Sequence, residues 1–195
     1  MKIIGFIASP RKEGNTARVV GAILEGAKEK GAETRSWYSG DLDIRPCQGC
    51  LCCHDSEGDR GCIIDDDMQE LYRAIDDADA IILGSPVYMG QMSAQAKIFT
   101  DRLFAQISPR FSPYYKEKTA RKKLVLVFTQ GNPDPGMFQV YFDYTKKMFQ
   151  LLEFDVQEVV VVAGMRNEPA HERKGLDTAM KAVGASLAAG QAPEA

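Results

Sequence analysis

The sequence lacks any apolar run long enough to cross a membrane, and it has almost no histidine. A membrane-spanning helix needs about 20 consecutive apolar residues, but the N-terminal apolar stretch at residues 3–8 is followed at once by Ser9-Pro10-Arg11. This stretch is also too short for the core of a signal peptide. We therefore expect a cytoplasmic protein with no membrane partner. The two histidines, His54 and His171, are too few to support a Ser-His-Asp hydrolase.

An excess of positive charge is also missing. The chain has 24 Lys and Arg against 27 Asp and Glu, a formal net charge of −3, which argues against a nucleic-acid partner. Its 45% hydrophobic and 26% charged residues are ordinary for a globular protein and exclude disorder. A length of 195 residues suits one α/β domain, which we expect over residues 1–190 with a tail at 191–195.

Short β-rich segments alternate with helical patterns along the chain. The expected strands are residues 2–8, 33–38, 80–84, 123–129 and 157–163. Helical spacing of apolar residues is expected over 16–30, from residue 66 onward, and over 93–104, 137–152 and 176–189. Five strands joined by helices imply right-handed crossovers, a parallel sheet and a three-layer α/β/α sandwich.

The first strand runs into a small polar loop before the first helix. Backbone N–H groups, hydroxyls and a helix N-terminus in Ser9-Pro10-Arg11-Lys12-Glu13-Gly14-Asn15-Thr16 can wrap an anion. The loop matches neither the dinucleotide G-x-G-x-x-G pattern nor a P-loop, so it suits a terminal monophosphate. The alternative is an ordinary turn in which Asn15 caps the helix.

Two further glycine-bearing loops follow the third and fourth strands. They are the turn Gly84-Ser85-Pro86-Val87-Tyr88-Met89-Gly90 and the segment Thr129-Gln130-Gly131-Asn132. Ligands of doubly wound sheets sit beyond the carboxyl ends of the strands, at the topological switch point. We therefore expect the three loops to meet in one crevice. The loop at residues 9–16 would bind the anion there, and the other two loops would lie against a flat ring.

These motifs together resemble the NAD(P)H-dependent FMN reductase branch of the flavodoxin-like superfamily. The resemblance covers the chain to about residue 165 and implies a doubly wound five-stranded parallel sheet of order 2-1-3-4-5. It implies FMN, with its phosphate held by Ser9, Arg11, Asn15 and Thr16. It also places the ring between two segments, which are Pro86, Val87, Tyr88, Met89 and Gly90 on one side and Thr129, Gln130 and Gly131 on the other.

All five cysteines fall in one excursion, expected at residues 44–65. Four thiolates, from Cys47, Cys50, Cys53 and Cys62, can hold a 4Fe-4S cluster or a zinc ion. Adjacent Cys52 and Cys53 cannot easily both bind one centre, so Cys52 is the expected spare. The pattern resembles iron–sulfur flavoproteins of the same superfamily, although the interval before Cys62 is longer here. Free thiols without any metal are the third alternative.

The resulting hypothesis is an FMN-dependent oxidoreductase that uses a 4Fe-4S cluster. It would move electrons between a reduced donor, NAD(P)H or a carrier protein, and a small acceptor or electron-carrier protein. The flavin carries the chemistry, so no catalytic side chain is assigned. The alternatives are a cluster-free NAD(P)H-dependent FMN or quinone reductase and a non-enzymatic carrier of flavodoxin type. The resemblance further implies a homodimer or homotetramer.

Overall fold

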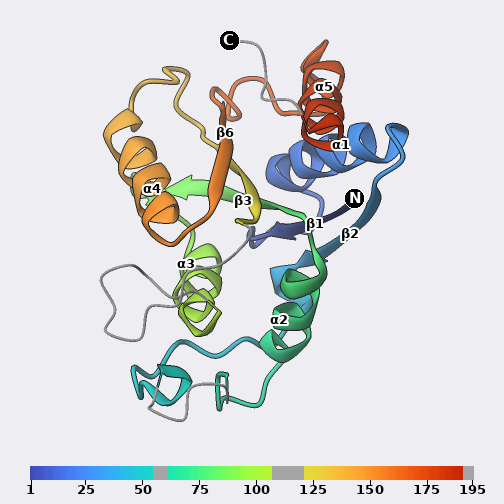
Figure 1. Ribbon diagram of the computed structural model, residues 1–195. Helices are drawn as coiled ribbons and strands as arrows, with labels where there is room; N and C mark the ends of the chain where they lie inside the picture. Colours follow the sequence, from blue (N-terminus) through green and yellow to red (C-terminus); the bar gives the residue numbers. More distant parts are fainter. Residues whose placement is uncertain (55–60, 107–120, 191–195) are drawn as a thin grey trace.

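The computed structural model describes residues 1–54, 61–106 and 121–190, so the expected tail at 191–195 lies outside it (Figure 1). The strands are β1 (Lys2–Ile7), β2 (Glu33–Tyr38), β3 (Ala80–Tyr88), β4 (Gln91–Met92), β5 (Lys123–Thr129) and β6 (Asp155–Val162). The helices are α1 (Asn15–Glu29), α2 (Met68–Asp77), α3 (Ala94–Arg102), α4 (Gln139–Leu151) and α5 (Leu176–Ala189). Every strand and helix expected from the sequence is therefore present.

Five strands form a parallel sheet in the order β2-β1-β3-β5-β6. This order confirms the flavodoxin-like 2-1-3-4-5 arrangement, with the two central strands, β1 and β3, side by side. Gly5 of β1 pairs with Ser36 of β2 and with Ile82 of β3. Because all five strands run the same way, their carboxyl ends lie along one edge, where the three predicted loops begin.

The turn expected at residues 84–90 is mostly strand. β3 continues to Tyr88, and β4 returns antiparallel to it through the pairs Val87–Met92 and Tyr88–Gln91. The turn itself is confined to Met89 and Gly90, whose φ angles are 49° and 78°. Two consecutive residues at positive φ give the tight turn that suits a two-residue hairpin. The sequence did not predict β4, because a strand of two residues shows no readable alternation.

Helices cover both faces of the sheet, as Figure 1 shows, with α1 and α5 on one face and α2, α3 and α4 on the other. The α1/α5 face packs apolar side chains such as Val20, Ile23 and Leu187, and the opposite face packs larger ones such as Phe99, Phe142 and Phe149. Burial of these two apolar faces stabilises the sandwich. No helix in the described ranges is long and apolar enough to span a membrane.

Two glycines set the distance between α1 and α5. A Cβ atom added to Gly26 would collide with the backbone of Lys181, and one added to Gly184 would collide with the carbonyl oxygen of Ile23. The helices therefore meet backbone to backbone. This close contact fixes α1, and with it the loop that leads into α1 from β1.

Candidate functional site

A cavity of about 780 Å³ opens at the carboxyl edge of the sheet. Its lining comes from the loop after β1, the end of β3, the segment after β5 and the loop after β6. The lining residues are Ser9, Arg11, Glu13, Gly14, Asn15, Thr16, Pro86, Val87, Tyr88, Thr129, Gln130, Gly131, Met165, Arg166, Pro169 and His171. Ten of the twelve residues predicted to bind a cofactor are among them. The structure thus brings the phosphate loop and both ring loops to one place.

The two predicted residues outside the lining are Met89 and Gly90. Both form the tight turn between β3 and β4, and Met89 is fully exposed at 100%. Pro86, Val87 and Tyr88 line the cavity instead from within β3. The segment predicted to face the ring therefore lines the cavity as a strand end rather than as a free turn.

The loop after β1 is rigid and leaves a helix N-terminus open. The Oγ of Ser9, a buried residue, accepts a hydrogen bond from the Arg11 N–H at 3.1 Å, and the Gly14 N–H donates to the Arg11 carbonyl at 3.2 Å. Gly14 is the N-cap of α1, and no side chain caps this helix. The first N–H groups of a helix carry partial positive charge, so this end of α1 suits an anion.

Asn15 does not cap α1, which was the alternative interpretation of this loop. Its Oδ1 accepts a hydrogen bond from the Ala170 N–H at 2.9 Å, and its Nδ2 donates to the Met165 carbonyl at 3.5 Å. The next residue, Thr16, is buried and shares a hydrogen bond of 2.7 Å with the hydroxyl of Thr129. Both side chains therefore join the start of α1 to other walls of the cavity.

A chain of serine hydrogen bonds holds the β3 wall. The Ser93 Oγ donates to the Ala8 carbonyl at 2.7 Å, and the Ser93 N–H donates to the Ser85 Oγ at 2.9 Å. The same Ser93 Oγ accepts from the Ala96 N–H and caps α3. The ends of β1 and β3 and the start of α3 are thus fixed relative to one another.

Gln130 leaves one buried polar atom unsatisfied in the cavity lining. Its side-chain Nε2 donates to the carbonyls of Asn132 at 3.3 Å and Asp134 at 2.6 Å, whereas its Oε1 has no hydrogen-bond partner among the described residues. The residue is only 2% exposed. A buried acceptor without a donor is costly, so this atom indicates a ligand that brings an N–H or O–H group.

The sequence did not predict the fourth segment of the cavity lining. This segment follows β6 and contributes Met165, Arg166, Pro169 and His171. Residues Glu13 and Gly14 were quoted in the phosphate loop but not assigned to the site. The available signal was the topology, because the fifth parallel strand must end at the same edge as the others. Nothing in the residue types of this segment resembles a known loop motif.

The cysteine loop follows β2 and precedes α2, and none of its cysteines is among the residues that line this cavity. Cys47 and Cys50 are exposed, Cys52, Cys53 and Cys62 are half-buried, and all five are free thiols. No three metal-ligating side chains among the described residues come together so as to hold a metal ion. The five thiols lie in the same loop but are not arranged to bind a metal ion.

The thiols nevertheless influence one another. Burial raises the pKa of Cys53, and the neighbouring sulfur atoms of Cys62, Cys50 and Cys47 raise it further. The pKa of Cys50 is lowered because the N–H and the thiol of Cys52 donate hydrogen bonds to its sulfur. Cys52, the expected spare, thus contacts a predicted ligand.

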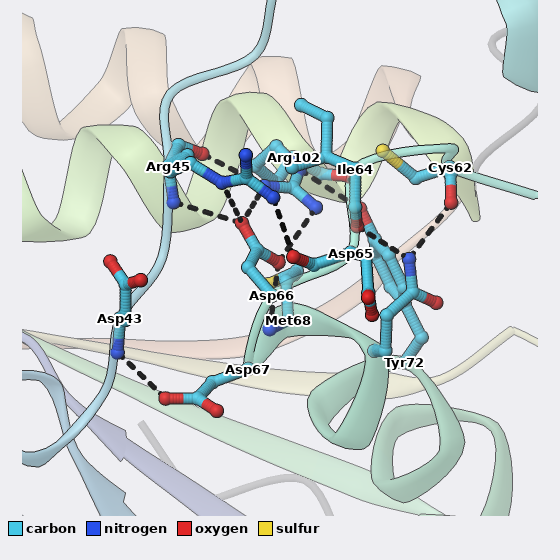
Figure 2. A network of polar contacts seen from close by, with 11 residues as sticks. Asp43, Arg45, Cys62, Ile64, Asp65, Asp66, Asp67, Met68, Tyr72 and Arg102 are labelled. Carbon is cyan, nitrogen blue, oxygen red and sulfur yellow. Dashed lines mark hydrogen bonds and ion pairs between the residues drawn. The ribbon is translucent and has the colours of Figure 1, made fainter.

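A buried ion pair anchors the base of this loop (Figure 2). Arg102 of α3 reaches the Oδ2 of Asp66 at 2.6 Å with Nη1 and its Oδ1 at 3.1 Å with Nη2, and both side chains are about 1% exposed or less. Arg102 Nη1 also donates to the Arg45 carbonyl at 2.8 Å, and the Arg45 N–H donates to Asp66 at 2.9 Å. The pair therefore joins the two arms of the loop, at residues 45 and 66, to α3.

The same region shows strong electrostatic coupling. Burial by itself would raise the pKa of Asp66, but hydrogen bonds from Arg102 and from the Arg45 N–H lower it below its ordinary value. The pKa of Tyr72 is raised, first by burial. Its hydroxyl donates to the Arg102 carbonyl at 2.8 Å. At the exit arm, Gln69 donates to the carbonyls of Cys62 and Ile64, each at 2.8 Å.

Comparison with known families decides what kind of protein carries this cavity. The model of the NADPH-dependent FMN reductase family matches residues 1–166. The chain belongs to this family. Its members are flavin-dependent oxidoreductases, and membership confirms the resemblance stated from the sequence motifs.

Curated relatives within this family branch are iron–sulfur flavoproteins. The one from Methanosarcina thermophila is 45% identical over 102 residues, 52% of this chain and 52% of the relative. One from Methanocaldococcus jannaschii is 46% identical over 102 residues, 52% of this chain and 51% of the relative. The matched stretch thus spans about half the length of the curated relatives.

Solved structures show the same fold at low sequence identity. The NAD(P)H:quinone oxidoreductase from Methanothermobacter marburgensis superposes with a TM-score of 0.71 at 18% identity, covering 96% of both chains. An FMN-dependent NADH-azoreductase from Bacillus anthracis, solved with FMN, gives 0.65 at 13% identity, covering 96% of this chain and all of the other. At these identities the likeness shows the fold alone.

The cavity of this FMN reductase family member fits FMN on its own features. Its volume is within the range of small-molecule and cofactor sites, about 300–1,000 Å³. The open N-terminus of α1 suits the phosphate, and the unsatisfied Gln130 Oε1 suits an N–H or O–H of the ligand. The cysteine loop fits a metal centre by its donor types but not by the positions of its thiols.

Proposed function

We propose that this protein binds FMN in the cavity and transfers electrons from a reduced donor, NAD(P)H or a carrier protein, to a small acceptor or carrier. The observation that carries the proposal is the meeting of four strand-end segments around one cavity, with a helix N-terminus and an unsatisfied buried acceptor in its lining. Membership of the NADPH-dependent FMN reductase family supports it.

In this proposal each segment of the cavity lining binds a different part of FMN. The Ser9 hydroxyl, the Arg11 guanidinium and the first N–H groups of α1 hold the phosphate. Tyr88 and the β3 end cover one side of the ring, and Thr129 to Gly131 cover the other. Gln130 Oε1 accepts a hydrogen bond from the ligand and so fixes its orientation. Bound FMN supplies the hydride and electron chemistry, so no acid or base side chain is required.

The flavin part is tested with the purified full chain. We expect FMN, rather than riboflavin or FAD, to be released on heat denaturation, in a ratio of about one per chain. Anaerobic addition of NADPH or NADH should bleach the yellow absorbance. Bleaching supports an enzyme, whereas bound FMN that neither nucleotide bleaches would favour a flavodoxin-type carrier. Absence of any flavin binding would overturn the proposal.

We further propose that Cys47, Cys50, Cys53 and Cys62 hold a 4Fe-4S cluster. The names of the curated relatives and the clustering of the cysteines support this. The described thiols are not gathered around a metal ion, so loading requires these four thiols to move toward one centre. Because Cys52 and Cys53 are neighbours in sequence, they offer a matched pair of variants.

Iron and acid-labile sulfide assays on anaerobically purified protein test the cluster. We expect about four iron atoms per chain, retained in Cys52→Ser and lost in Cys53→Ser. Iron near zero in the unmodified chain favours the second candidate, a cluster-free FMN or quinone reductase, which the separated free thiols also favour. One stoichiometric zinc would indicate a structural metal instead.

The homodimer or homotetramer remains a proposal. Large apolar side chains are exposed along α4 and at the β3–β4 turn, among them Val140 at 86% and Met89 at 100%. Such exposed groups mark contact surfaces when they gather in one patch. Light scattering of the purified chain measures the assembly directly.

A further inference from the structure

The loop at residues 164–173 closes one side of the cavity and extends past the family model, which ends at residue 166. Its start is fixed by backbone hydrogen bonds, from the Gly164 N–H to the Asn132 carbonyl at 2.7 Å and from the Met165 N–H to the Gln130 carbonyl at 2.9 Å. The position of the residue that follows, Arg166, is therefore set by the segment after β5.

The same loop is held to the start of α1 by Asn15. The Asn15 Oδ1 accepts from the Ala170 N–H at 2.9 Å, and its Nδ2 donates to the Met165 carbonyl at 3.5 Å. These contacts occupy the amide that the sequence motif assigned to the phosphate. They also place the segment containing Arg166 beside the N-terminus of α1.

Arg166 lies in this clamped segment, and its guanidinium has no hydrogen-bond or ion-pair partner in the part of the chain that the structure describes. It lines the cavity, and its Cβ is 3.6 Å from the position of a Cβ built on Gly131. Arg11 lines the same cavity and likewise lacks a side-chain partner among these residues. Glu13 is the acidic residue of the lining.

We propose that Arg166 binds the phosphate monoester of the flavin, and that Asn15 is a positioning residue that holds the Arg166 loop against α1. This inference rests on the proposed function. A phosphate monoester carries close to two negative charges at neutral pH, which a helix N-terminus and Arg11 only partly balance. A planar guanidinium pairs with phosphate oxygens through two parallel hydrogen bonds, and an unpaired one at the cavity is available for this.

The test compares FMN with riboflavin, which has the same ring and no phosphate. The full chain, freed of flavin, is titrated with each while flavin fluorescence is followed. We expect Arg166→Gln to raise the Kd for FMN about tenfold (~1.4 kcal/mol) and the Kd for riboflavin less than about twofold. Lys174→Gln, which removes a positive charge from the residue directly after this loop and outside the cavity lining, should leave both unchanged. Arg166→Lys should lie between Gln and the unmodified chain.

A double-mutant cycle separates the roles of Asn15 and Arg166. If Asn15 acts through Arg166, Asn15→Ala weakens FMN binding in the unmodified chain but has little further effect in the Arg166→Gln background. Additive losses would overturn the positioning role, because they indicate that Asn15 binds the phosphate by itself. Thermal melting confirms that each variant is folded at the temperature of the titration.

The outcomes distinguish this inference from the function on which it rests. If the unmodified chain binds FMN and Arg166→Gln changes both flavins equally or neither, the role of Arg166 is wrong while the FMN proposal stands. An unchanged Kd for FMN with a raised KM for NADPH but not NADH would assign Arg166 to the nucleotide's phosphate and would also overturn it. Failure of the unmodified chain to bind FMN overturns both.

Discussion

The cavity and the cysteine loop differ in where their buried, hydrogen-bonded side chains lie. Around the cavity, several lining side chains are themselves buried and paired, as in the 2.7 Å hydrogen bond between Thr16 and Thr129. In the cysteine loop, the buried pair of Arg102 and Asp66 lies at the base, while Cys47 and other thiols stay exposed or half-buried. The buried hydrogen bonds thus lie within the lining of the cavity, whereas the buried ion pair of the cysteine loop lies at its base and not among its thiols.

The largest expected effect comes from removing the anchor of the cysteine loop. Asp66→Ala leaves the guanidinium of Arg102 buried without its carboxylate, which costs about 3–5 kcal/mol of the free energy of unfolding. For a chain of this size, Tm should fall by roughly 6–20 °C. If the two regions are independent, the Kd for FMN stays within about twofold at a temperature where the variant is folded.

The matched control is Asp177→Ala, which removes the partner of Arg18 in an exposed ion pair whose side chains are 44% and 46% exposed. An exposed pair contributes at most about 1 kcal/mol. Urea denaturation measures both variants. A loss below about 1 kcal/mol in Asp66→Ala would show that the anchor is not needed for the fold.

A smaller effect is expected at the cavity when one member of a buried hydroxyl pair is removed. Thr16→Val keeps the side-chain shape but leaves the Thr129 hydroxyl without its partner, at a cost of about 1–3 kcal/mol. Thr16→Val combined with Thr129→Val should cost less than the sum of the single changes, since no unpaired hydroxyl remains. Urea denaturation of all three variants measures the coupling, and strict additivity would contradict it.

Acid should act on the cysteine loop through Asp66. The pKa of this carboxylate is lowered in the folded state, so the unfolded chain takes up the proton first as pH falls. The contribution is complete above the ordinary aspartate pKa of ~3.9 and is lost as pH falls through the folded value. The slope from this group is at most ~1.4 kcal/mol per pH unit. Urea denaturation from pH 7 to pH 3 should show this slope in the unmodified chain, and Asp66→Ala should lack it.

The sequence predicted the fold well because the fold depends on strong local signals. The continuous apolar segment of β1 and the α1 stripe of Val19, Val20 and Ile23 are clear local signals, and the parallel arrangement follows from the alternation of strands and helices. The hairpin at Met89 and Gly90 was missed because β4 has only two residues. A short strand is specified by its partner strand rather than by its own pattern.

The sequence predicted only those site residues that belong to recognisable loop motifs. Ten of the twelve residues proposed for the cofactor line the cavity, since strand-end loops of a parallel sheet must meet. The contact between Asn15 and Ala170 joins residues 155 positions apart, and the pair of Arg102 and Asp66 joins residues 36 apart. No local pattern marks such pairs. From the sequence alone, an arginine at the end of a helix, such as Arg102, is interpreted as a solvated charge because its partner is not known.

The smallest expected effect lies at the rim of the cavity and tests whether an exposed aromatic side chain contributes to ligand binding. Tyr88 lines the cavity but is 45% exposed. Aromatic stacking is worth about 0.5–1.5 kcal/mol beyond burial, so Tyr88→Ala should raise the Kd for FMN roughly two- to tenfold, and Tyr88→Phe should preserve it. Tyr144→Ala, at an aromatic residue of α4 that is 59% exposed and outside the lining, is the control. If Tyr88→Ala binds FMN as tightly as the unmodified chain, Tyr88 only packs at the edge of the cavity, and the other lining residues bind the flavin without it.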